Sequence, residues 1–192
     1  MNYTDIFPST KTITKNTSQI LLIVASSWLI AISAQFSIHL PFSPVPITGQ
    51  TLVILLIGAL LGKSRGAAAV ALYIVQGAAG IPVFAGGKSG LVTLLGPTGG
   101  YLFGFLAAAY VVGILTELQH NKSIQYFGFS LIIGNLIIYT FGLFWLVRFV
   151  GEPHALQLGL YPFLVSDFLK ILLGAMILFG CQKFFPIPGT KG

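Results

Sequence analysis

Long apolar segments fill most of this chain, and very few charged residues interrupt them. Only 7% of the residues are charged and 55% are hydrophobic, whereas a soluble domain carries about 25% charged residues. So few charges cannot cover a surface that faces water, and the apolar exterior must therefore face lipid. The apolar segments cover residues 20–36, 47–62, 67–80, 98–118, 126–147 and 162–181. They predict an all-α integral membrane protein, a bundle of six transmembrane helices.

The lengths of these segments bear on the domain organisation. A helix needs about 20 residues to cross the hydrocarbon core, and four of the six segments approach or meet that length. The second and third are shorter and are flanked by Gly and Pro. Short spans often mark the binding site of a solute-binding membrane protein, although a thin, protein-lined part of the bundle would give the same pattern. We expect one membrane domain at 19–184, between a polar N-terminal tail at 1–18 and a C-terminal tail at 185–192.

The basic residues predict how the bundle is oriented. Lys and Arg accumulate in cytoplasmic connections. Here alternate connections hold seven basic residues against two: Lys11, Lys15, Lys63, Arg65, Lys122, Lys183 and Lys191 against Lys88 and Arg148. Both termini are therefore expected in the cytoplasm. Residues 1–18 could be the first region of a secretory signal, but no small-residue cleavage site follows them, which favours an uncleaved first span.

The three connections on the predicted outer side are candidates for folded structure. They cover residues 39–46, 81–90 and 151–161, and the first two are rich in Gly and Pro yet retain apolar and aromatic residues. The inner connections are short and charged. We therefore expect folded Gly/Pro-rich outer loops that cap the bundle, with the functional site on that side.

Asp167 and Lys170 are the first candidate ligand-binding residues. Their i, i+3 spacing places both on one face of the sixth helix, about 8 and 12 Å inward from Pro162 at 1.5 Å per residue. Ionisable residues inside a span are costly and indicate a functional site. The pair could clamp a neutral polar group that contains N–H and C=O. The alternative is an ion pair that only locks the helix, although two apolar residues would hold it as well or better.

A glycine-rich stretch at 86–90, together with residues 95–101, is the second candidate site. Glycine lets backbone amides approach a ligand closely, and a helix N-terminus favours an anion such as a carboxylate. The alternative is a tight turn followed by the motif Gly100-x-x-x-Gly104, which suits close helix packing. The candidates in this stretch are Gly86, Gly87, Lys88, Gly99 and Tyr101.

Several other functions are excluded. Residues 58–64 resemble a nucleotide-binding P-loop but are one residue short of its spacing. The three histidines stand far apart, without the spacing of metal ligands, and no hydrolase motif occurs. The basic residues form no run, which argues against nucleic acid. We therefore expect no enzyme activity, no metal and no cofactor in this chain.

Four ordered motifs resemble the BioY family. They are PVPITGQTL at 44–52, GIPVFAGG at 80–87, LGPTGGYL at 95–102, and YPF at 161–163 followed by Asp167 and Lys170. BioY proteins are the biotin-specific substrate-binding (S) components of energy-coupling-factor (ECF) vitamin transporters. The resemblance extends from about residue 20 to residue 184.

The resemblance implies high-affinity biotin binding near the outer face of a six-helix protein in a prokaryotic inner membrane. It also implies partners: a transmembrane coupling subunit and two ATPases, which would use the ATP. Asp167 would accept from the ureido N–H groups and Lys170 would donate to the ureido oxygen. The valerate carboxylate would bind near Lys88, the glycines or the start of the fourth helix, and the reverse orientation stays open. Phe84, within the second motif, completes the candidate set.

Two departures from the family pattern and two alternative functions follow. The small-residue patch that docks the coupling subunit corresponds here to Ser27-x-x-x-Ala31, so Ser27 and Ala31 are the expected docking residues. Glycines replace an amide side chain that some relatives carry at 85–88. The chain could instead be an S component for another vitamin. It could also be a self-sufficient small-solute transporter with Asp167 as a relay, although that would favour more acids inside the spans.

Overall fold

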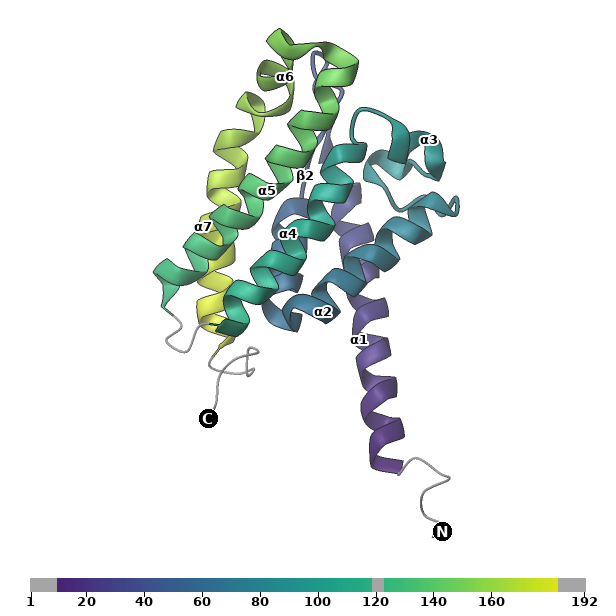
Figure 1. Cartoon of the computed structure of the whole chain (residues 1–192), viewed down its shortest axis with the longest axis vertical. Coiled ribbons are helices and arrows are strands. Elements are labelled where there is room, and N and C mark those ends of the chain that lie inside the picture. Colours follow the sequence, from purple (N-terminus) through teal and green to yellow (C-terminus); the bar gives the residue numbers. More distant parts are fainter. Residues whose placement is uncertain (1–9, 119–122, 183–192) are drawn as a thin grey trace.

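The computed structural model describes residues 10–118 and 123–182, with side chains from residue 17 onward, and shows a helical bundle (Figure 1). The long helices are α1 (Thr10–Gln35), α2 (Gln50–Ala78), α4 (Gly99–Leu118), α5 (Ile124–Val150) and α7 (Leu164–Cys181). The shorter elements are β1 (Ser37–Ile38), β2 (Ile47–Thr48), η2 (Ala85–Gly87), α3 (Gly90–Leu95), α6 (Glu152–Gly159) and η3 (Tyr161–Phe163).

The second and third apolar segments form two helical arms, which meet at a kink at Gly62 and together carry the label α2. Gly62 interrupts the helix with φ 78° and ψ 175°, a conformation that glycine adopts far more readily than other residues. The amide of Lys63, at the bend, donates to Glu117 Oε1 of α4 at 2.9 Å. Lys63 Nζ also lies 3.4 Å from Glu117 Oε2. The bend is visible at the lower end of α2 in Figure 1.

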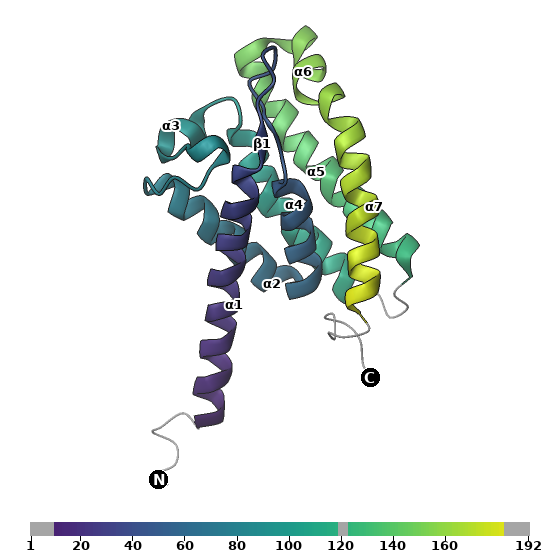
Figure 2. The ribbon, with the colours of Figure 1, turned by 180° about the vertical axis from the view of Figure 1, so that it is seen from behind.

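The connections between the long helices gather at one end of the bundle. Figures 1 and 2 show the β1–β2 hairpin, α3 and α6 at one end of the bundle, opposite to the N-terminal end of α1 and the C-terminal end of α7. Ser37 pairs with Thr48 in the hairpin, and Ser43 Oγ donates to Leu158 O at 2.6 Å. The expectation that these Gly/Pro-rich connections are folded is confirmed.

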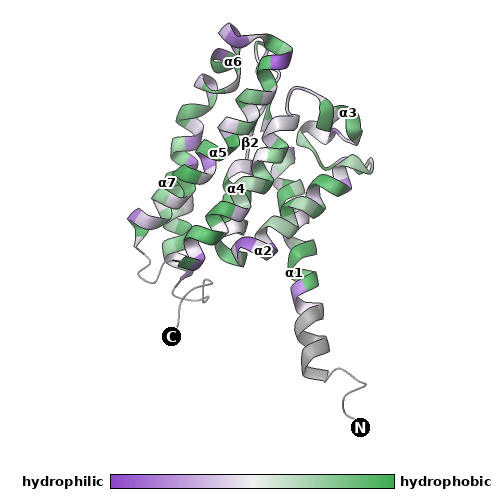
Figure 3. Ribbon diagram, viewed as in Figure 1, coloured by the Kyte–Doolittle hydropathy of each residue, from purple (hydrophilic) through white to green (hydrophobic). Residues whose placement is uncertain are grey.

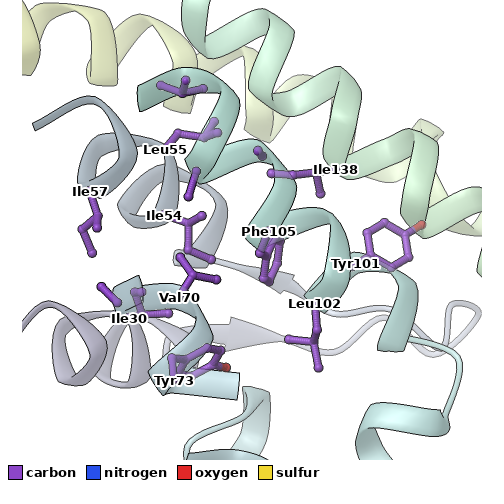
Figure 4. Close-up of a cluster of buried hydrophobic side chains, with 14 of the residues drawn as sticks. Ile30, Ile54, Leu55, Ile57, Val70, Tyr73, Tyr101, Leu102, Phe105 and Ile138 are labelled. Atoms are coloured by element: carbon purple, nitrogen blue, oxygen red, sulfur yellow. The ribbon is translucent and has the colours of Figure 1, made fainter. Parts of the chain in front are cut away.

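Helix α4 lies at the centre of the bundle, between α2 and α5. A Cβ atom added at Gly100 would overlap Trp145 of α5, and one added at Gly104 would lie 3.0 Å from Ile138 Cα. The Gly100-x-x-x-Gly104 motif therefore packs α4 against α5, as its packing interpretation predicts. Figure 4 shows the apolar core beside it, with Ile54 and Val70 of α2 near Phe105 of α4.

Many large apolar side chains are exposed on the outside of the bundle, and Figure 3 shows that hydrophobic residues predominate along its helices. Among the described residues, five helical stretches are long and apolar enough to cross a membrane. They are Thr17–Gln35, Gln50–Ala78, Gly99–Leu118, Ile124–Val150 and Glu152–Cys181. Helix α2 is one of these five stretches, although its two arms meet at a bend at Gly62. The chain is a multi-pass membrane protein.

The N-terminal region differs from the sequence prediction in two respects. Helix α1 begins at Thr10, so its first turns fall in the predicted polar tail. The predicted C-terminal tail, 185–192, lies outside the described residues. Ser27 and Ala31 are 0% and 4% exposed. The docking prediction for this pair is corrected, because side chains packed inside the chain cannot meet a partner. The spacing of small residues does not reveal which neighbour covers them.

Candidate functional site

A pocket lies at the end of the bundle that carries the folded connections. Its walls come from α2, α4, α5 and α7, and its rim comes from the hairpin and from residues 84–93. Apolar and aromatic side chains form most of the lining, which suits a small organic ligand. The aromatic lining residues are Phe84, Tyr101, Phe105, Tyr139 and Phe163.

The pocket contains Asp167, a carboxylate that is only 5% exposed. Lys170 Nζ donates to Asp167 Oδ1 at 2.8 Å. On the other carboxylate oxygen, Tyr139 Oη donates to Oδ2 at 2.5 Å and Asn135 Nδ2 donates to Oδ2 at 3.3 Å. Hydrogen bonds to an ionised acceptor are the strong ones. The α5 side chains and Lys170 together fix the carboxylate against the pocket wall.

Lys170 is held from two sides and still has donor capacity. Besides Asp167, its ammonium donates to Thr51 Oγ1 of α2 at 3.2 Å. An ammonium has three N–H donors, so one remains for a ligand acceptor. Asp167 and Lys170 therefore offer an acceptor and a donor side by side in an apolar pocket. This arrangement can hold a neutral polar group by both its N–H and C=O.

A second, smaller cavity lies behind the ion pair. Its polar lining consists of Thr51, Asn135, Asp167 and Lys170, and the rest is aliphatic. Asn135 Oδ1 is buried with no hydrogen-bond partner among the described residues. The cavity measures about 10 Å³, close to the space that one water needs. One water molecule there would satisfy the Asn135 oxygen.

Residues 83–88, which include the first part of the rim, are fastened to α1 by Gln35. Gln35 Nε2 donates to Val83 O and Phe84 O at 3.4 and 3.3 Å, and Gln35 Oε1 accepts from the Gly87 amide at 3.1 Å. Phe84 packs on Gly77 and lies edge-on to Tyr73, with ring centroids 5.6 Å apart. The Gln35 hydrogen bonds thus join helix α1 to the rim.

Replacing Gln35 with leucine is expected to loosen the rim. Each net hydrogen bond contributes about 1 kcal/mol, so hydrogen–deuterium exchange of residues 83–88 should accelerate roughly tenfold. The matched control is Ser33→Ala on the same helix, since the Ser33 hydroxyl bonds only to Ile30 O of its own turn. Equal exchange in wild type and Gln35→Leu would show that Gln35 does not hold the rim.

The structure brings together five of the eight predicted ligand-binding residues: Asp167, Lys170, Lys88, Tyr101 and Phe84 all line the pocket. Gly86, Gly87 and Gly99 are not on the lining. Two of them are closely packed: an added Cβ at Gly86 would lie 2.9 Å from His39 Cε1, and one at Gly99 would overlap Leu94 O. The amides of Gly87 and Gly99 already bond to Gln35 and Gly96.

Sequence reasoning missed the polar residues that surround the ion pair. Asn135 and Tyr139 lie four residues apart in an apolar span, and this i, i+4 spacing on one helix face could have revealed them. Gln50 and Thr51 also line the pocket. They lie in the PVPITGQTL motif at 44–52, from which the sequence predicts no binding role. No three His, Cys, Asp or Glu side chains gather as a metal site within the described ranges.

Known proteins match this chain over most of its length. The BioY family model matches residues 8–187. "Biotin transporter BioY" of Thermotoga maritima is 39% identical over 84% of this chain and 90% of the relative. "Probable biotin transporter BioY" of Pyrococcus horikoshii is 37% identical over 85% of this chain and 93% of the relative.

The fold also matches a solved structure. A crystal structure of the S-component for biotin from an ECF-type ABC transporter aligns with a TM-score of 0.79 and 24% sequence identity. The alignment covers 88% of this chain and 93% of the other. On the extent of the family match and the identity to its members, this chain belongs to the BioY family.

Proposed function

We propose that this chain binds biotin and mediates its uptake across the membrane, as the substrate-specific S component of an ECF-type transporter. The observation that carries the proposal is the Asp167–Lys170 pair inside an otherwise largely apolar pocket. Biotin combines a ureido group with an apolar body. The ureido group needs an acceptor for its N–H groups and, beside it, a donor for its C=O. The relatives bear the name of biotin transporters, which supports the same ligand.

The pocket suggests how biotin would lie. The ureido N–H groups would donate to Asp167, and the ureido oxygen would accept from the free N–H of Lys170. Phe84, Tyr101 and Phe163 would enclose the apolar ring system. The valerate carboxylate would extend toward Lys88 at the rim, where a cation is present and water is near. The reverse orientation, with the carboxylate on Lys170, would leave the ureido N–H groups without an anionic acceptor.

The membrane arrangement forms part of the proposal. If each arm of α2 crosses the membrane, the bundle has six crossings, and the described ends of α1 and α7 lie on one side (Figure 2). The distribution of Lys and Arg supports a cytoplasmic position for that side. Membership of the BioY family supports the inner membrane of a prokaryotic cell. The pocket then opens outward.

Transport would require partners, because the sequence has no P-loop of its own. A transmembrane coupling subunit and two ATPases would supply the energy, and the chain would deliver biotin inward within that complex. The surface that meets the coupling subunit must lie outside the buried Ser27–Ala31 pair. Dependence of uptake on ATP hydrolysis by these partners is the expected result in reconstituted liposomes.

A titration with biotin tests the proposed ligand directly. The purified chain in lipid nanodiscs should bind biotin with a measurable heat signal, and unlabelled riboflavin or thiamine should not compete. Competition by one of those vitamins would assign the pocket to another vitamin. No binding of biotin by folded protein would reject the proposal.

Tyr139→Phe is expected to weaken biotin binding by about tenfold or more. The substitution removes the O–H that donates to Asp167 Oδ2 at 2.5 Å, and hydrogen bonds to charged groups contribute about 1.5–3 kcal/mol. Tyr126→Phe is the matched control on the same helix, because the Tyr126 hydroxyl donates to Leu115 O, away from the pocket. Equal affinities in the two variants would contradict a role for Tyr139 at the site.

A further inference from the structure

Helix α3 (Gly90–Leu95) presents an apolar face to the outside of the molecule. Leu91, Val92 and Leu95 are 60%, 87% and 60% exposed, and together they cover the outward side of this short helix. The inward side carries Thr93, which lines the pocket, and Leu94, which packs on the core. Figure 3 shows the apolar character of α3 at the upper edge of the bundle.

This pattern is the reverse of the one expected for a cap in water. A water-facing helix places polar side chains outward and apolar ones inward. Here the Thr93 hydroxyl donates to Ser89 O at 2.9 Å and lies on the inward side, while Val92, the most exposed large apolar residue of the described chain, points outward. A contiguous exposed apolar patch of this kind marks a surface that meets a membrane or another protein.

The neighbours of α3 place it at the level of a membrane boundary. The carbonyl of Gly96, which follows α3, accepts from Trp145 Nε1 at 3.0 Å. The Arg148 guanidinium lies 5.0 Å from the centre of the Trp145 ring. Trp side chains concentrate at the membrane–water interface, and an Arg near the end of a span reaches with its charge to the interface. Helix α4, a candidate span, begins at Gly99.

The C-terminal end of α3 is also close to exposed apolar side chains of the spans. Phe103 of α4 is exposed, and its ring centroid lies 6.1 Å from that of Trp145. Phe144, one position before Trp145, is exposed as well. The same tryptophan thus contacts the end of α3 and the lipid-facing side of α4.

We propose that α3 is an interfacial membrane anchor, whose residues Leu91, Val92 and Leu95 insert into the boundary between lipid headgroups and acyl chains. Short apolar faces bind membranes in this way when they lie in the plane of the interface. Because Lys88 and Thr93 line the pocket within or just before this helix, the anchor holds one side of the pocket rim against lipid. Gln35 holds the residues that precede this helix, 83–87, against α1. The inference needs only the membrane location and does not depend on the ligand.

The depth of Val92 in a bilayer tests the proposal. Val92→Cys, in a Cys181→Ala background and labelled with an NBD fluorophore, is placed in phosphatidylcholine nanodiscs without partner subunits. We expect blue-shifted emission and strong quenching by lipids with a doxyl group near the top of the acyl chain. One control is His154→Cys on α6, an exposed polar position whose probe should emit as in water. The other is Leu169→Cys on α7, an exposed apolar position whose probe should be quenched by doxyl groups along the acyl chain.

Hydrogen–deuterium exchange gives a second readout. Replacing Leu91, Val92 and Leu95 together by serine should raise hydrogen–deuterium exchange of residues 84–93 several-fold in nanodiscs, with exchange in α5 unchanged. Water-like, unquenched emission at Val92 would overturn the proposal. So would a probe that becomes protected only after the coupling subunit and ATPases are added, because α3 would then be a protein-docking surface.

Discussion

Replacement of Asp167 by asparagine is expected to reduce biotin affinity by about 100-fold. The ureido N–H groups would lose an anionic acceptor, and hydrogen bonds to charged groups contribute about 1.5–3 kcal/mol each. A loss near 3 kcal/mol corresponds to about two decades in the dissociation constant. Calorimetric titration of the wild type and the variant in nanodiscs measures the change. Lys170, partly buried beside the vacated charge at 19% side-chain exposure, would also lose its partner.

The second ion pair of the described chain supplies the control. Lys63 and Glu117 lie 3.4 Å apart at the opposite end of the bundle, with 47% and 28% side-chain exposure, where a pair contributes only about 0–1 kcal/mol. Glu117→Gln should leave biotin affinity within about twofold. An Asp167→Asn variant that binds biotin as tightly as Glu117→Gln would place the ligand elsewhere.

A double replacement separates a ligand clamp from a structural lock. In Asp167→Leu/Lys170→Met both charges are removed, so no unpaired charge stays buried, and such replacements are often neutral or stabilising. We expect thermal stability close to that of the wild type together with loss of biotin binding. Loss of stability with retained binding would show that the pair serves only to hold α7.

Gly113→Ala is expected to destabilise the protein by about 3 kcal/mol. Gly113 of α4 faces the bend of α2, and an added Cβ would overlap the backbone of Lys63. Backbone at a helix bend cannot rotate away as a side chain can, and overpacking a close contact typically costs about 1–3 kcal/mol. The midpoint of thermal unfolding, followed by tryptophan fluorescence in detergent, should fall by several degrees.

Gly128→Ala on α5 is the matched control. A Cβ there meets nothing within 4 Å, and alanine favours a helix by up to about 1 kcal/mol over glycine. Its unfolding midpoint should stay the same or rise. If Gly113→Ala unfolded at the same temperature as Gly128→Ala, the close approach of α4 to the α2 bend would not contribute to stability.

The sequence by itself determined the class of protein and the placing of Asp167 and Lys170 on one helix face. Apolar length and scarcity of charge depend only on the solvent that each segment must face, so they identify a multi-pass membrane protein without any knowledge of packing. The i, i+3 spacing of Asp167 and Lys170 is fixed by helix geometry, which is local. The Gly100-x-x-x-Gly104 motif likewise indicated a close helix contact before its partner helix was known.

The tertiary structure alone decided which helix faces which. Asn135 and Tyr139 reach Asp167 from α5, and Thr51 reaches Lys170 from α2; periodicity cannot give these pairings because they join distant segments. For the same reason Ser27 and Ala31, similar to a docking motif by spacing, are buried. The two short segments remain two helical arms that meet at Gly62, and the backbone there lies against Gly113 and Glu117 of α4. How the arms are bent depends on these contacts, which exist only after the bundle has assembled.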